Sequence, residues 1–127
     1  MNRPIKFRVW DKRETKGMST QNMLYDAQLH HLWQDFVDYP GYELMQYTGL
    51  TDSNDNPIYE GDILMYKSGS IPTTGVIGQV LYEADHGGYI FQWERKGRNQ
   101  DYNNLNCDVA FESVIVGNIF EHSELLK

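Results

Sequence analysis

The sequence predicts a mainly β protein that folds as a small barrel. Short segments alternate apolar and polar residues, which is typical of half-buried strands. Glycine and polar residues separate these segments at close spacing, as in small barrels. Aromatic residues make up 13% of the 127 residues, and they favour pleated, half-buried surfaces. The length suits one hydrophobic core, so we expect residues 1–127 to form a single domain.

Five segments show the clearest strand pattern, namely residues 5–10, 63–66, 75–82, 89–93 and 114–120. In the first of them, Ile5, Phe7 and Val9 fall on one face, which predicts an N-terminal β extension. Residues 44–47 are expected to add a short strand. Residues 121–126 are expected to close the chain as one helical turn.

The connections contain the residue types that favour turns. Residues 48–57 are rich in Asp, Asn and Gly and predict a loop. Residues 59–62 predict a tight corner, and residues 85–88 predict the turn of a β-hairpin. Residues 94–106 are charged and rich in Asn, which predicts another loop.

Residues 18–36 allow two interpretations. Apolar side chains spaced as on one face of a helix are Tyr25, Leu29, Leu32, Trp33 and Phe36. The same stretch also allows two short strands, at residues 23–25 and 29–33. The β pattern on both sides favours the strands, and the sequence alone leaves helix and strands open.

The net charge of −7 is unevenly distributed along the chain. Residues 1–16 contain six bases and two acids, a net charge of +4, so the remaining residues carry −11. An acidic body repels phosphate backbones and disfavours general nucleic-acid binding. No segment reaches the ~20 apolar residues of a membrane span, and Cys107 alone forms neither an internal disulfide nor a zinc site. We therefore expect a cytoplasmic protein with no cofactor and no metal.

Paired carboxylates at Glu60 and Asp62 are the candidate catalytic or metal-binding groups. Two neighbouring carboxylates raise the pKa of one of them, as some acid–base enzymes require. The structural interpretation is that Gly61 turns a corner while Asp62 bonds to nearby backbone N–H groups. We favour it because the sequence offers no third partner. Residues 52–56 imitate the start of a calcium loop, but Pro57 and Ile63 occupy the positions that need Gly and Glu.

Basic residues beside aromatic ones give a second functional candidate. Arg95, Lys96 and Arg98 lie close to Trp93 and Tyr102 in the sequence. Single-stranded nucleic acids bind to such combinations, because bases neutralise phosphates and rings stack on nucleobases. A solvated loop explains the same three charges more simply.

Three stretches resemble the YopX family of phage and prophage proteins: IKFRVWD at residues 5–11, LMQYTGL at 44–50 leading to IYEGDI at 58–63, and VGNIFE at 116–121. The resemblance implies an SH3-like barrel encoded by a phage or prophage. It brings no catalytic residue, cofactor or substrate with it. Within or beside these stretches we expect structural roles for Gly49, Glu60, Gly61, Asp62, Gly117 and Asn118.

Our leading hypothesis is a non-enzymatic accessory protein of the host bacterial cytoplasm that binds proteins, itself included. The abundant aromatic residues and the basic N-terminal strand on an acidic body motivate it, and they predict a homo-oligomer. Nucleic-acid binding through Arg95, Lys96 and Arg98 is the first alternative. An enzyme that uses Glu60 and Asp62 is the second.

Overall fold

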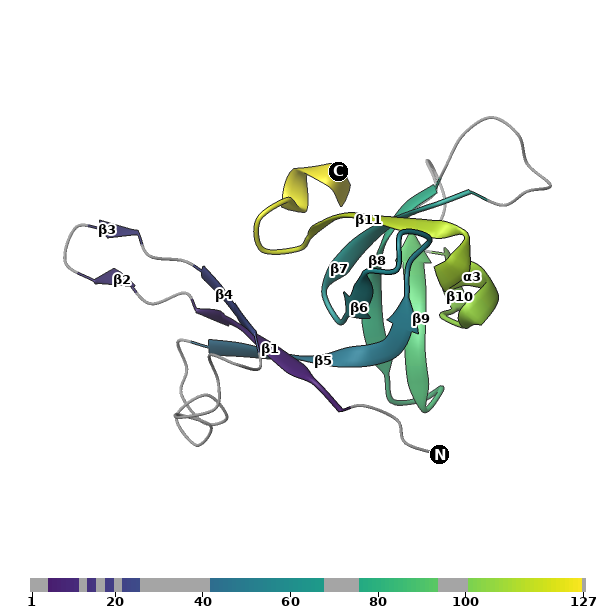
Figure 1. The fold of residues 1–127 in the computed structure, drawn as a ribbon, viewed down its shortest axis with the longest axis horizontal. Coiled ribbons are helices and arrows are strands. Elements are labelled where there is room, and N and C mark those ends of the chain that lie inside the picture. The colour runs from purple at the N-terminus through teal and green to yellow at the C-terminus, as the bar shows by residue number, and fades with distance from the viewer. Residues whose placement is uncertain are drawn as a thin grey trace. The chain divides into compact units, whose positions relative to one another are not determined.

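A computed structural model describes residues 5–11, 14–15, 18–19, 22–25, 42–67, 76–93 and 101–126 (Figure 1). The chain is mainly β, as predicted. It divides into two compact units, residues 1–47 and 48–127. The single domain over residues 1–127 stays a prediction. No helix in the described ranges is long and apolar enough to cross a membrane.

The first unit is the N-terminal β extension. It contains β1 (Phe7–Asp11), β2 (Glu14–Thr15), β3 (Met18–Ser19), β4 (Asn22–Tyr25) and the beginning of β5 (Tyr42–Thr51). β1 lies between β4 and β5 and pairs antiparallel with both, while β2 pairs with β3. Val9 is fully buried, and Phe7 packs against it as the alternation predicts. Ile5 precedes the strand and is exposed, so this strand begins two residues later than predicted.

The second unit is an SH3-like half-barrel. Its elements are β6 (Pro57–Tyr59), β7 (Asp62–Tyr66), β8 (Val76–Glu83), β9 (Gly88–Trp93), β10 (Asp101–Asn104), α3 (Cys107–Phe111), β11 (Ser113–Asn118) and the 3₁₀ turn η1 (Ser123–Leu126). Four strands, β7 to β10, follow one another as an antiparallel meander. The chain then returns through α3 so that β11 pairs with β7, which gives the sheet order β10-β9-β8-β7-β11.

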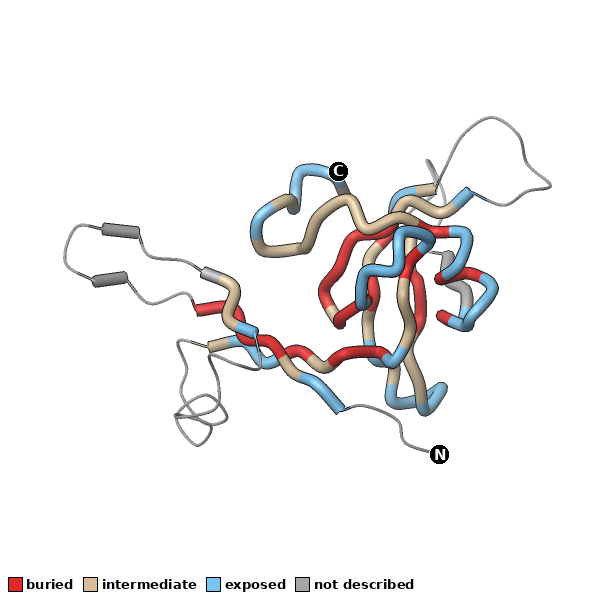
Figure 2. The backbone as a smooth tube through the Cα atoms, in the orientation of Figure 1, coloured by how far each residue is buried: buried red, intermediate tan, exposed pale blue. Residues whose placement is uncertain are grey.

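The core of the half-barrel surrounds Phe91, which is fully buried. Figure 2 shows the buried residues along the strands of this unit. The ring of Tyr66 meets Phe91 edge to face at 6.1 Å between centroids, and the ring of Trp93 lies 5.5 Å away. β6 contributes Ile58 and α3 contributes Val109 to the same cluster. Gly78 is required beside it, because a Cβ built there would lie 2.7 Å from Cε2 of Phe91.

The predicted strands at residues 63–66, 75–82 and 89–93 are confirmed to within a residue at each end. The last strand ends at Asn118, not at residue 120, because the Asn118 side chain opens a turn there. The predicted helical turn at residues 121–126 is present as η1.

Two predicted loops were too long. The strand expected at residues 44–47 runs to Thr51, because Thr48 Oγ1 donates to the Ile58 carbonyl at 2.8 Å and holds β5 against β6. The loop expected at residues 48–57 therefore shrinks to residues 52–56. The loop expected at residues 94–106 contains β10, and it is followed by the unpredicted helix α3.

The ambiguous stretch at residues 18–36 is resolved in part. Residues 22–25 form β4, so the strand interpretation is right there. The second expected strand, at residues 29–33, lies outside the described residues.

Candidate functional site

The corner at residues 59–62 is built around Gly61 and Asp62. Gly61 has a φ of 84°, which a residue with a Cβ rarely adopts. Asp62 is 2% exposed, and its Oδ2 accepts the Tyr59 N–H at 2.8 Å. The Gly61 N–H donates to the Val80 carbonyl at 2.9 Å. The Asp62 carboxylate therefore stabilises the corner through this hydrogen bond.

The two sequence motifs at residues 60–62 and 117–118 meet in space. In the pairing of β7 with β11, Asp62 lies opposite Asn118 and Ile63 lies opposite Gly117. The Ile119 N–H donates to the Gly61 carbonyl at 2.9 Å and extends this contact. Glu60 is half-buried in the same corner. Gly49 lies in β5 and has a φ of 88°, a backbone conformation that residues with a Cβ rarely adopt, which explains why glycine occupies this position.

A C-terminal clasp, formed by Gly117, Asn118 and His122, closes the end of β11. Asn118 Oδ1 accepts the N–H groups of Phe120 and Glu121 at 3.0 and 2.9 Å. His122 Nδ1 accepts the Asn118 N–H at 3.2 Å. The His122 ring covers Gly117 so closely that a Cβ there would lie 2.6 Å from it. His122 was not among the residues expected to be structural, although an Asn that follows a glycine is a common start of such a turn.

Asp52 holds the turn between β5 and β6. It is 3% exposed, and its Oδ1 accepts the N–H groups of Asn54 and Asn56 at 3.0 and 2.9 Å. Its Oδ2 accepts the Ile115 N–H of β11 at 3.0 Å. Both carboxylate oxygens thus bind backbone N–H groups, and residues 52–56 form a turn, as the failed calcium-loop pattern predicted.

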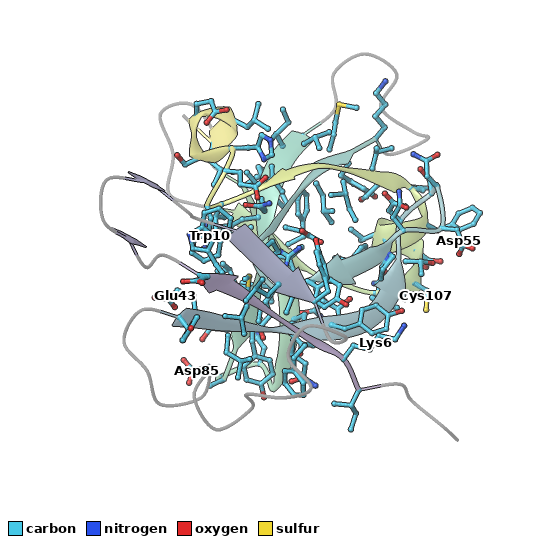
Figure 3. All side chains as sticks on the ribbon, turned by 60° about the vertical axis from the view of Figure 1, so that its left-hand side comes forward. Lys6, Trp10, Glu43, Asp55, Asp85 and Cys107 are labelled. Atoms are coloured by element: carbon cyan, nitrogen blue, oxygen red, sulfur yellow. The ribbon has the colours of Figure 1, made fainter. Side chains whose placement is uncertain are left out.

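No group of three His, Cys, Asp or Glu side chains suited to a metal ion occurs in the described part of the chain. Cys107 is exposed at the start of α3 (Figure 3). Arg95, Lys96 and Arg98, the predicted nucleic-acid contacts, lie outside the described residues.

The described surface feature best suited to binding is a pair of tyrosines on the β8–β9 hairpin. Tyr82 lies opposite Tyr89, and their rings meet edge to face at 5.4 Å with an interplanar angle of 72°. Tyr82 is 52% exposed. The pair shares its sheet face with Val80 and Phe91, so it continues the aromatic core outward to the hairpin tip.

Two acidic residues lie at the tip end of this hairpin. Glu83 follows Tyr82 and points to the opposite face of β8, and Asp85 is exposed at the tip (Figure 3). Tyrosine combines a large apolar ring with a polar hydroxyl group, which suits it to protein interfaces. We call Tyr82, Tyr89 and Asp85 the hairpin surface, and it is the candidate binding site.

Comparisons with known proteins agree with this fold. A family model described as "YopX protein" matches residues 6–127. Among solved structures, the chain is similar to the crystal structure of protein EF1440 from Enterococcus faecalis, with 22% sequence identity and a TM-score of 0.51. The alignment covers 99% of this chain and 100% of that one, and at this identity it shows the fold alone. The comparison with curated proteins finds no match.

Proposed function

This chain belongs to the YopX family, and from that membership we propose that it is a phage or prophage accessory protein that binds other proteins without catalysing a reaction. The proposed place of action is the cytoplasm of the host bacterium. Its proposed partners are proteins, a second copy of the chain included.

The hairpin surface is the observation that carries the proposal. Tyr82 keeps half of its surface in water while its ring is already oriented by Tyr89. A rigid, exposed aromatic ring loses little conformational entropy when a partner covers it. Such rings are frequent among the residues that dominate binding energies at interfaces.

The environment of the carboxylates supports binding over catalysis. Asp62 and Asp52 are both buried, and each accepts hydrogen bonds from the backbone of its own turn. A general acid or base must reach the proton that it transfers. Neither group reaches a substrate without breaking the turn that it stabilises.

The charge of the hairpin surface defines the partner that it fits. Asp85 is exposed at the hairpin tip that the tyrosines approach, so the complementary protein surface is basic there and carries an apolar or cationic group over the rings. Residues 1–16 of a second copy meet this description through their net charge of +4.

A capture experiment with two tyrosine variants tests the proposal. Tyr82→Ser removes the exposed ring of the hairpin surface, and Tyr25→Ser removes a tyrosine that is 46% exposed on β4. We expect one protein from host cells to bind wild type and Tyr25→Ser alike. With Tyr82→Ser, titration of that purified protein should give a dissociation constant at least about tenfold higher. Equal affinity for all three proteins would exclude the hairpin surface.

A further inference from the structure

The two terminal strands of the five-stranded sheet, β10 and β11, differ in how their outer edges are used. An unpaired edge presents N–H and C=O groups that accept another strand, and proteins usually block it with a bulge, a proline, a lysine or a cover. The edge that lacks such a block is the one that is available to a partner.

The outer edge of β11 is closed along its length. At its start, the Ser113 carbonyl accepts the Ser53 N–H at 2.8 Å, and the Ile115 N–H donates to Asp52 Oδ2 at 3.0 Å. At its end, His122 bonds to both backbone groups of Asn118, at 3.2 and 2.9 Å. A register shift between Ile115 and Gly117 adds a bulge. No strand can add here without first removing the Asp52 turn and the C-terminal clasp.

The edge of β10 is built differently. β10 pairs with β9 in an unbroken register, from Asp101 opposite Trp93 to Asn104 opposite Ile90. The Leu105 N–H donates to the Tyr89 carbonyl at 3.0 Å, which fixes the alternation of inward and outward backbone groups. The N–H and C=O groups of Tyr102 and Asn104 therefore point away from β9.

The sequence of β10 reads Asp-Tyr-Asn-Asn and contains neither proline nor lysine, two residues that often block an edge. The backbone hydrogen bonds that the structure describes for β10 and Leu105 go to β9, on the side away from the outward groups of Tyr102 and Asn104. β10 therefore differs from β11, whose outer backbone groups bond to the Asp52 turn and to His122.

The outward groups of β10 are complementary to those of a second β10. In antiparallel pairing across a two-fold axis, Tyr102 lies opposite Asn104 of the partner subunit, and the reverse pair follows by symmetry. The outward N–H and C=O groups of each Tyr102 and Asn104 then bond across the axis. In this register Asp101 lies opposite Leu105 of the partner subunit, so no like charges oppose each other.

We infer that the outer edge of β10 is a self-association surface, which takes the same strand of a second copy and continues the five-stranded sheet across a two-fold axis. This inference rests on the proposed function and specifies its self-binding part. The contact is small, so the dimer is weak and depends on protein concentration. Backbone hydrogen bonds carry it, so salt that screens exposed charges leaves it largely intact.

Substitutions at Tyr102 separate the backbone group from the side chain. Tyr102→Pro removes the outward N–H but none of the bonds to β9. An edge strand accepts proline at such a position, where the N–H points away from the sheet. Tyr102→Val keeps the N–H and loses the ring. Sedimentation at rising concentration, in about 0.1 and 0.5 M salt, should show wild type and Tyr102→Val moving toward twice the monomer mass of 14.8 kDa. Tyr102→Pro should raise the dissociation constant at least about tenfold.

Amide hydrogen exchange of the wild-type protein gives a second measurement that needs no variant. Protection of the Tyr102 and Asn104 amides should rise with protein concentration, while the Leu105 amide, already bonded to Tyr89, should be protected throughout. Association of Tyr102→Pro equal to wild type, or concentration-independent exchange at these amides in a wild-type dimer, would overturn the β10 edge and leave self-association standing. A wild-type protein that stays monomeric would overturn self-association, while the capture experiment with Tyr82→Ser still decides binding to other proteins.

Discussion

Single buried residues, and Asp52 above all, hold distant parts of the half-barrel together. Its two oxygens accept three backbone N–H groups, two within its own turn and one from Ile115 on β11. A buried carboxylate without partners would cost several kcal/mol, so these bonds offset its desolvation. One side chain thereby joins the β5–β6 turn to the last strand of the sheet.

Asp52→Asn should lower the free energy of unfolding by about 2 kcal/mol. The amide keeps one accepting oxygen but turns its NH₂ group toward the Ile115 N–H, so two donors face each other in a buried position. Asp55→Asn is the matched control, because Asp55 is exposed and its φ of 66° suits asparagine. Urea unfolding of both variants measures the difference. Equal midpoints would show that the carboxylate of Asp52 adds nothing that its amide lacks.

Gly78→Ala should destabilise the protein by about 2 kcal/mol, the usual cost of overpacking a core. The added Cβ would meet the Gln92 carbonyl oxygen and the Phe91 ring, and the backbone oxygen belongs to a paired strand that cannot move aside. Gly88→Ala adds the same atom on β9, where nothing lies within 4 Å of it. Thermal unfolding should separate the two variants by several degrees. A Gly78→Ala protein as stable as Gly88→Ala would mean that the sheet yields there.

At the scale of elements, the C-terminal clasp links η1 to the edge of β11. η1 packs against β8, while His122 bonds to Asn118 and covers Gly117. His122→Ala should cost about 1 kcal/mol, since it removes one hydrogen bond and the packing on Gly117. The Asn118 amide should then exchange its hydrogen faster than in wild type. His86→Ala, at an exposed hairpin position, should change neither quantity. Unchanged Asn118 exchange in His122→Ala would mean that the clasp closes without the imidazole.

Most of the elements could be predicted from local pattern, and the exceptions have physical causes. β7 and β9 are short apolar runs with consecutive buried residues, and β8 alternates around Gly78 and Val80, so each is typical of a strand that contacts the core. β10 has two asparagines and little intrinsic strand preference, so only its pairing with β9 makes it a strand. α3 is five residues long, too short to show a helical period. Its cap, where Asn106 Oδ1 accepts the Val109 N–H at 3.0 Å, is the one local signal.

The candidate site was predictable only in its structural part. The motif residues at 61–62 and 117–118 were expected to be structural, and their convergence follows from the pairing of β7 with β11. The hairpin surface was not predicted, because alternation assigns Tyr82 and Tyr89 to the core face of their strands. Periodicity predicts which face of the sheet a side chain points to, but not how far along the strand the core extends. Tyr82 lies beyond the end of the core and therefore remains exposed.

For the whole molecule, the distribution of charge limits the partners. Residues 1–16 carry +4 and the rest carries −11. Attraction between the exposed charges of residues 1–16 in one copy and the acidic part of another would weaken with salt, because the screening length falls to about 8 Å at physiological ionic strength. Pairing through the backbone of β10 would not weaken with salt in this way. The salt dependence of self-association therefore distinguishes the charge-driven contact from the strand-edge contact.

The same charge distribution argues against the nucleic-acid alternative and makes it testable. Non-specific binding proteins reach dissociation constants of about 10⁻⁴ to 10⁻⁶ M at physiological salt, through phosphates neutralised by lysine and arginine. Only Arg95, Lys96 and Arg98 form such a group outside residues 1–16. Against a body of −11, we expect a single-stranded oligonucleotide to bind with a dissociation constant above about 10⁻⁴ M in fluorescence anisotropy. Replacement of these three residues by alanine should leave that value unchanged.

The matched control variant replaces Arg3, Lys12 and Arg13 by alanine, which removes the same charge from the N-terminal segment. The opposite result would be micromolar binding that weakens steeply with salt. If the variant of Arg95, Lys96 and Arg98 lost this binding and the N-terminal variant kept it, these three residues would form a nucleic-acid site.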